Sequence, residues 1–270
     1  ILLLLLNSCD KIETPLEAEQ TSTQGIIWDD TSYALLDNSE QIVLFEEFTG
    51  HSCQQCPAGT ALLEDLADAN PGKIVTTSIH AGFFANTQDN QNGSYSTDHT
   101  TLSGEDYADN FGVITNPISL VNRKEYNGSK LVNTGNWEPA FTEFSTLQPI
   151  VQINMTTLYD DSTKTVQVSS SFDWSNFPSD QVSYQLYVLE NGIIDWQKDG
   201  IDNLENYTHN HMLRMVLNGT WGNEVIDSDS VYTYSSQINE NWNANNIDIV
   251  GFLYNTSTFD VYQVNKTHLK

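Results

Sequence analysis

The chain has 270 residues, enough for two folding units that each bury a core of their own. Its 36 acidic against 10 basic residues give a net charge of −26, which would repel phosphate backbones and excludes a nucleic-acid partner. Three cysteines, Cys9, Cys53 and Cys56, are too few for a scaffold built on disulfides.

The first forty residues predict a membrane anchor and a tether. Leu6-Asn7-Ser8-Cys9 follows an apolar run and fits a bacterial lipobox, in which a small residue directly precedes the cysteine that is lipidated. We expect residues 1–9 to be the remainder of a signal peptide with its lipobox, and Cys9 to carry the lipid that anchors the protein. A truncated hydrophobic helix with an incidental cysteine is the alternative. Residues 10–40, rich in Glu, Thr, Ser and Gln, predict a flexible tether.

Residues 41–148 predict an α/β domain. Gln41–Phe48 has the β-branched and aromatic content of a buried strand, and Ala58–Ala69 carries leucines on one helical face. Lys73–His80 is typical of a second strand. A strand, a helix and a strand in this order predict a parallel pair with a crossover helix.

Cys53 and Cys56 fall at the junction of that first strand and helix. A thiol at a helix N-terminus has a lowered pKa and is nucleophilic, so Cys53 is expected to attack and Cys56 to resolve the mixed disulfide. Two alternatives remain open. The pair could be half of a zinc site, which would need two further thiolates or histidines, or it could be a permanently oxidised structural disulfide.

Segment 43–48 leading into Cys53-Gln54-Gln55-Cys56, together with Phe111–Pro117 downstream, resembles the thioredoxin superfamily. The resemblance implies that Pro117 is a cis-proline that holds the extended backbone of a substrate. It also implies that Glu47 is a buried acid that accepts the proton of the resolving thiol. The alternative for Glu47 is a strand residue that faces solvent.

The histidines near these positions have ordinary interpretations as well as functional ones. His51 and His80 could stabilise the thiolate by their charge, or could be ordinary polar or loop residues. His209 and His211 would lie on one face of a strand at the spacing of two metal ligands, but the sequence suggests no third ligand. We therefore expect neither a metal nor a cofactor.

Residues 149–270 change to a period of two, with short strands and turns rich in Asp, Asn, Ser and Gly. This pattern predicts an all-β domain, an immunoglobulin-like sandwich. Trp221 and Trp242 could form a sugar-binding platform, but aromatic residues of this kind also fill sandwich cores.

The order of lipobox, tether, the Glu46–Pro57 segment, the Pro117 loop and a β domain carrying Tyr207–Arg214 resembles the twenty-eight-kilodalton outer-membrane protein family of Gram-negative lipoproteins. The resemblance implies an outer-membrane location and this architecture more than an activity.

Two functions are therefore expected from the sequence. The first is an envelope lipoprotein that exchanges thiols and disulfides with envelope proteins through Cys53 and Cys56, helped by Pro117 and Glu47. The alternative is a non-catalytic binding or adhesion module with a structural disulfide, whose β domain contacts a partner that the sequence leaves unidentified.

Overall fold

The computed structural model describes residues 28–270. The lipobox with Cys9, and residues 10–27 of the expected tether, lie outside the described residues. The described chain forms three α-helices, three short 3-10 helices and fifteen strands.

The helices are α1 (Cys56–Ala69), α2 (Leu102–Phe111) and α3 (Trp137–Phe144), with the 3-10 turns η1 (Phe83–Ala85), η2 (Thr134–Asn136) and η3 (Ala244–Asn246). The strands are β1 (Asp30–Tyr33), β2 (Val43–Thr49), β3 (Ile74–His80), β4 (Ile118–Val121), β5 (Leu131–Val132), β6 (Val151–Asp160), β7 (Thr165–Trp174), β8 (Val182–Glu190), β9 (Ile193–Asp199), β10 (Asp202–His209), β11 (Met212–Val216), β12 (Asn223–Val225), β13 (Tyr232–Gln237), β14 (Ile247–Asn255) and β15 (Val261–His268).

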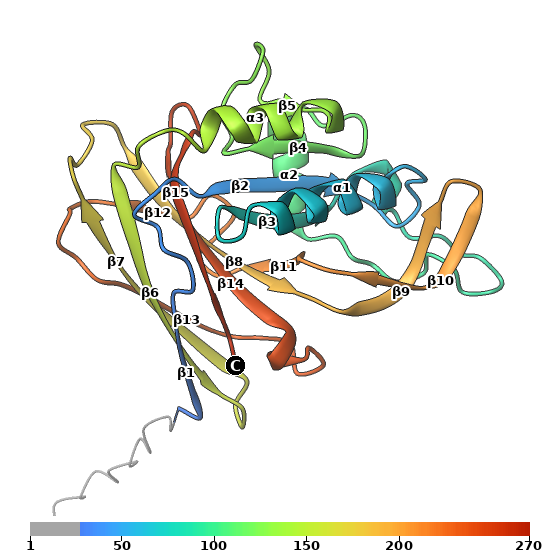
Figure 1. The fold of residues 1–270 in the computed structure, drawn as a ribbon. Helices are drawn as coiled ribbons and strands as arrows, with labels where there is room; N and C mark the ends of the chain where they lie inside the picture. The colour runs from blue at the N-terminus through green and yellow to red at the C-terminus, as the bar shows by residue number, and fades with distance from the viewer. Residues whose placement is uncertain (1–27) are drawn as a thin grey trace, which may run out of the picture.

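A nine-stranded mixed sheet runs through the molecule in the order β15-β14-β8-β11-β3-β2-β4-β5, with β12 also paired to β8 (Figure 1). The expected parallel pair is present, since β2 and β3 pair in parallel over seven positions. Strand β11 joins the two halves of the chain: it pairs in parallel with β3 and antiparallel with β8.

The expected fold class, an α/β thioredoxin-like domain followed by an all-β immunoglobulin-like sandwich, is wrong. Strands β2, β3 and β4 are not a sheet of their own, because β11 supplies the neighbour of β3 and continues into β8 and β14. An open strand edge presents a row of unpaired backbone groups to any strand that can reach it. Local sequence patterns predicted β2 and β3 but not which strand would cover that edge.

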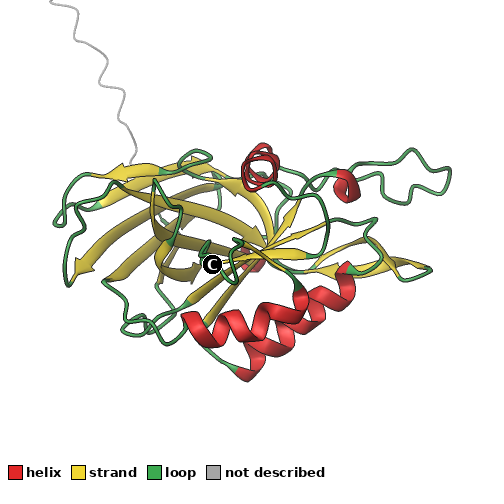
Figure 2. Cartoon of the chain, turned by 90° about the horizontal axis from the view of Figure 1, so that it is seen from above, coloured by secondary structure: helices red, strands yellow, loops and turns green. Residues whose placement is uncertain are grey.

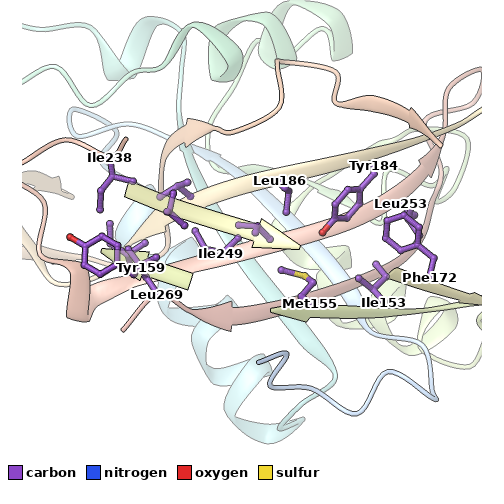
Figure 3. Close-up of a cluster of buried hydrophobic side chains, with 14 of the residues drawn as sticks. Ile153, Met155, Tyr159, Phe172, Tyr184, Leu186, Ile238, Ile249, Leu253 and Leu269 are labelled. Carbon is purple, nitrogen blue, oxygen red and sulfur yellow. The ribbon is translucent and has the colours of Figure 1, made fainter. Parts of the chain in front are cut away.

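Four further strands form a second sheet in the order β1-β6-β7-β13, which packs face to face on the C-terminal part of the large sheet. In Figure 3, Ile153, Met155 and Phe172 of the smaller sheet meet Tyr184 and Leu253 of the larger one. All five side chains are buried, so alternate residues of these strands supply a two-sheet core.

The helices cover both faces of the N-terminal half of the large sheet. Because successive strand residues point to opposite faces, Val43 and Phe45 of β2 pack with residues of α1 and α3, while Leu44 and Phe48 pack with residues of α2. Figure 2 shows two helices together on one side of the strands and the third on the opposite side. Both faces of β2 are therefore covered, which explains why all seven residues of the strand are buried, including Glu46 and Glu47.

A buried ion pair connects the two halves of the chain. The guanidinium of Arg123, after β4, donates to both carboxylate oxygens of Glu46 on β2, at 2.7 and 2.8 Å, and to the Tyr187 hydroxyl of β8 at 2.9 Å. Arg123 and Glu46 are fully buried. Since Tyr187 belongs to the C-terminal half of the chain, these hydrogen bonds connect the two halves.

Candidate functional site

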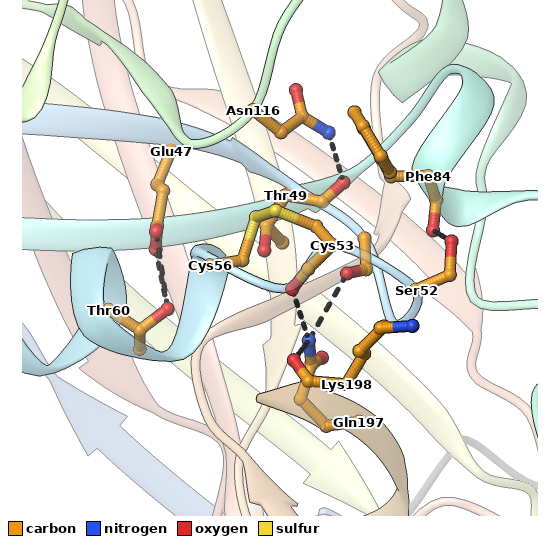
Figure 4. The surroundings of a disulfide bond; sticks show 11 residues. Glu47, Thr49, Ser52, Cys53, Cys56, Thr60, Phe84, Asn116, Gln197 and Lys198 are labelled. Carbon is orange, nitrogen blue, oxygen red and sulfur yellow. Dashed lines mark hydrogen bonds between the residues drawn. A yellow bond between two sulfur atoms is a disulfide. The ribbon is translucent and has the colours of Figure 1, made fainter. Parts of the chain in front are cut away.

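Cys53 and Cys56 form a disulfide between the end of β2 and the start of α1 (Figure 4). This is the strand-to-helix junction at which the sequence placed the pair. Cys53 lies in the turn before the helix, and Cys56 is the first helical residue. The exposed fractions of the two residues are 2% and 1%. Both sulfurs are therefore shielded from solvent.

The β9–β10 hairpin covers the turn that carries Cys53. Lys198 donates its backbone N–H to the carbonyl of His51 at 2.8 Å, and Gly200 donates to Gln54 at 2.9 Å. The buried Gln197 side chain donates to the Cys53 carbonyl at 3.1 Å, as Figure 4 shows. Sequence reasoning missed this cover, because hairpin and turn are about 145 residues apart and their bonds are mostly backbone contacts.

Glu47 is buried on the α1 side of β2, where both its carboxylate oxygens accept from the Thr60 hydroxyl at 3.2 Å. Burial raises its pKa to about 8. The solvent-facing alternative for Glu47 therefore does not hold. Its role as the proton acceptor of a resolving thiol stays a prediction.

The peptide bond between Asn116 and Pro117 is cis. The Asn116 side-chain amide donates to the backbone carbonyl of Thr49 at 3.0 Å, which fixes this loop against the end of β2 (Figure 4). Pro117 also lies against α1, since a side chain added at Gly59 would overlap its ring. The structure thus brings Pro117, Glu47 and the disulfide into one region, while the role of Pro117 in holding a partner chain stays a prediction.

Four histidines cluster beside the disulfide. The ring centroids of His80, His99 and His209 are 5.4 to 5.6 Å apart, and His51 lies 5.9 Å from His99. His80 lies at the end of β3 and His209 at the end of β10, so strands from both halves of the chain build the cluster. His99, in the long segment between β3 and α2, went unnoticed in the sequence because no nearby pattern singles it out.

His80, His99 and His209 are held in their neutral form. Burial, followed by the nearby imidazoles, lowers the pKa of His80 well below its ordinary value. Burial likewise lowers the pKa of His99, against the opposing effect of Asp195. Burial and the neighbouring His99 lower the pKa of His209 to about 4. These rings therefore carry little positive charge with which to stabilise a thiolate.

His209 and His211 do not share a strand, contrary to the expected spacing. Strand β10 ends at His209 and β11 begins at Met212, with His211 at a backbone φ of 54° between them. Because the backbone turns between the two strands, only His209 lies in the cluster.

A small cavity of about 10 Å³ lies between the disulfide and the histidines, lined by Cys56, His80, Tyr207 and His209 among others. Such a volume holds about one water-sized group. As the side chains stand in residues 28–270, no group of three or more His, Cys, Asp or Glu residues is arranged to hold a metal ion.

The sequence model of one protein family, described as outer membrane protein Omp28, matches residues 104–270. The matched range is well over half of the chain and includes β11, β14 and β15. The chain belongs to the Omp28 outer membrane protein family. The match begins after Cys53, Cys56, His80 and His99, and of the histidine cluster it includes His209 alone. Membership places the protein at the outer membrane.

Solved structures agree with this fold. HBP35 of Porphyromonas gingivalis superposes with a TM-score of 0.63 and 15% identity, over 85% of this chain and 76% of that one. A protein of Agrobacterium tumefaciens superposes with a TM-score of 0.53 and 12% identity, over 86% and 96% of the two chains. At these identities the likeness concerns the fold alone.

A domain of the outer membrane lipoprotein Omp28 from Porphyromonas gingivalis is 24% identical, with a TM-score of 0.36, over 45% of this chain and 89% of that one. No curated protein sequence matches this chain. Within the described residues no helix has the length and apolar character needed to cross a membrane.

Proposed function

We propose that this Omp28-family protein is a non-catalytic binding module of the outer membrane, anchored by a lipid at Cys9, in which the Cys53–Cys56 disulfide is structural. The observation that carries the proposal is the burial of both cysteines, at 2% and 1% exposure, beneath the β9–β10 hairpin.

Burial bears directly on the competing function, thiol–disulfide exchange. In exchange, a thiolate attacks a disulfide sulfur, so one sulfur of the pair must be accessible to the partner. Here the backbone of Lys198 and Gly200 and the side chain of Gln197 close over the turn that holds Cys53. A partner protein could reach the sulfur only after the hairpin had moved. A structural disulfide needs no such motion.

Three segments anchored beside the disulfide carry exposed apolar side chains, which we propose as contacts for a protein partner. Segment 49–54 hydrogen-bonds to Phe84, Asn116 and Gly200, which lie in three separate loops. Each loop also carries a large exposed apolar side chain: Phe83 is 80% exposed, Ile114 94% and Ile201 93%. Solvent-exposed apolar side chains on anchored loops are typical of protein contact sites. The disulfide would hold these loops in place for a protein partner.

The reduction potential of the Cys53–Cys56 pair tests the structural role. We expect a value below about −300 mV, the range of structural disulfides in exported proteins. Replacing Gln197 by Ala removes an amide that covers Cys53, and should accelerate reduction by dithiothreitol. Gln237→Ala is the matched control, because that amide also donates to a backbone carbonyl but lies on β13. A potential in the oxidoreductase range, together with mixed disulfides trapped by Cys56→Ser, would contradict the proposal.

Site-specific photo-crosslinking in intact cells tests the contact surface. A crosslinker placed at Ile114 or Ile201 should capture the same partner protein, while one at Ile226, 75% exposed between β12 and β13, should not. Equal capture from all three positions would show unspecific contact and remove this part of the proposal.

The lipid at Cys9 is tested with the complete precursor. Mass spectrometry of the mature protein should find an acylated N-terminal Cys9, and Cys9→Ser should release the protein from the membrane fraction. A mature N-terminus at any other residue would refute the anchor.

A further inference from the structure

Three imidazoles of the histidine cluster form a nearly equilateral triangle. The centroid distances are 5.4 Å between His80 and His99, 5.4 Å between His80 and His209, and 5.6 Å between His99 and His209. The point equidistant from these three centroids is therefore about 3.2 Å from each. In a zinc site the metal is about 2.0–2.1 Å from the ligating nitrogen, and the ring centre lies roughly 1.1 Å farther. The triangle has the size of a three-histidine metal site.

His99 has the hydrogen-bond pattern of a metal ligand, whose second ring nitrogen usually donates to a carboxylate or backbone carbonyl. His99 Nε2 lies 2.9 Å from the Asp195 carboxylate, which leaves Nδ1 as the other nitrogen. In the described part of the chain, His99 Nδ1 and His209 Nε2 are buried without any partner.

His80 is the most unusual member of the triangle. It is 3% exposed, and neither of its ring nitrogens finds a hydrogen-bond partner among residues 28–270. A buried imidazole without partners is unfavourable, and such groups call for a water, an ion or a functional role. His80 and His209, but not His99, also line the cavity of about 10 Å³ beside Cys56.

We propose that His80, His99 and His209 bind one divalent first-row transition-metal ion of the kind that prefers imidazole, with Zn²⁺ as the representative. Three neutral imidazoles suit zinc, copper or nickel. Asp195, hydrogen-bonded to His99, supplies a negative charge next to the ion. The surplus of acidic over basic residues favours cations near the protein as a whole.

Binding requires the rings to turn, since their nitrogens do not converge on one point as they stand. The interplanar angles of 44° to 67° show rings packed edge and face against one another. His80 can turn without losing a hydrogen bond, because it makes none among the described residues. The site is therefore expected to be formed by the metal on binding. It goes beyond the proposed function and does not depend on it.

The test is titration of the untagged, metal-free protein, with its disulfide intact, with Zn²⁺ by calorimetry and with Co²⁺ by visible absorption. We expect one ion per chain and a raised melting temperature. His80→Gln and His209→Gln should each weaken binding by more than about 100-fold. Asp195→Asn leaves all three rings in place and should weaken it by about 10–100-fold. His268→Gln, at a half-exposed histidine outside the cluster, is the matched control and should bind as the wild type does.

Several outcomes overturn the proposal. Absence of stoichiometric binding of either ion would refute the site. Loss of binding in His268→Gln, or unchanged binding in both His80→Gln and His209→Gln, would place the ion elsewhere. If the histidine variants fail to fold, Asp195→Asn decides, and an unchanged affinity refutes the site. X-ray absorption of the zinc-loaded protein should count three imidazoles, and a smaller number also refutes it.

Discussion

Replacing Glu46 by Gln should destabilise the protein by about 3–5 kcal/mol, because it leaves the charge of Arg123 uncompensated in the core. Arg123 and Glu46 are both fully buried, and their two hydrogen bonds measure 2.7 and 2.8 Å. The Tyr187 hydroxyl also donates to Glu46 at 2.8 Å, so the substitution disturbs a second buried donor. A neutral amide of the same size removes the negative charge without creating a cavity.

Aromatic rings around the guanidinium offset only part of this loss. The carbon at the centre of the Arg123 guanidinium lies 4.9 to 5.6 Å from four ring centroids, those of Tyr107, Phe111, Phe252 and Tyr254. Rings attract a cation by about 0.5–2 kcal/mol each in favourable geometry, and they do so in wild type and variant alike. They keep the variant foldable but do not replace the carboxylate.

Equilibrium unfolding in urea, followed by tryptophan fluorescence and far-UV circular dichroism, measures the loss. Glu40→Gln is the control, since its ion pair with Lys73 is exposed and should contribute less than about 1 kcal/mol. The double variant Glu46→Leu with Arg123→Met removes both charges and should be markedly more stable than Glu46→Gln alone. A loss below about 1 kcal/mol for Glu46→Gln, or a double variant no more stable than the single one, would refute the reasoning.

Three further predictions concern the disulfide region. The double variant Cys53→Ala with Cys56→Ala should lose about 2 kcal/mol by urea unfolding, because the closed loop is short, with a sequence separation of 3; a loss near zero would contradict a structural role. Glu47 keeps its proton in the folded state up to its pKa of about 8, but releases it near 4.5 when unfolded, so stability should fall as pH rises through this window. Glu47→Gln should remove that fall and gain about 2–5 kcal/mol over wild type at pH 9 but not at pH 4; parallel pH profiles of the two proteins would disprove the assignment. Gly50→Ala would drive its Cβ into the backbone of Phe84 and should lower the melting temperature by several degrees, whereas an unchanged value would show that this turn yields freely.

Much of the local structure could be predicted from the sequence. The β-branched and aromatic content before Thr49 predicted β2, the leucine spacing predicted α1, and the cysteine pair was placed at their junction. These predictions succeeded because hydrophobic periodicity and turn residues act over a few neighbouring positions. The family resemblance was also correct at the level of the outer membrane protein family.

The arrangement of these elements could not be predicted in the same way. The prediction of a separate α/β domain was wrong because β11, more than 130 positions after β3, pairs with β3. The backbone amide of Ser78 donates to the carbonyl of His211 in this pairing. Backbone hydrogen bonds of this kind leave no side-chain pattern in the sequence. The same holds for the hairpin that covers Cys53, since Lys198 and Gly200 contact the turn through their main chains.

The sequence by itself determined the strand at β2, the helix at α1, the position of the cysteine pair and the membership in an outer-membrane family, since each depends on residues close together in the chain. Only the tertiary structure decided that one sheet joins both halves, that the disulfide is buried, and that His80, His99 and His209 meet. The physical reason is that burial and proximity arise from long-range strand pairing. The pairing of β3 with β11 brings the ends of β3 and β10 together, and with them the histidines that neither half could have assembled alone.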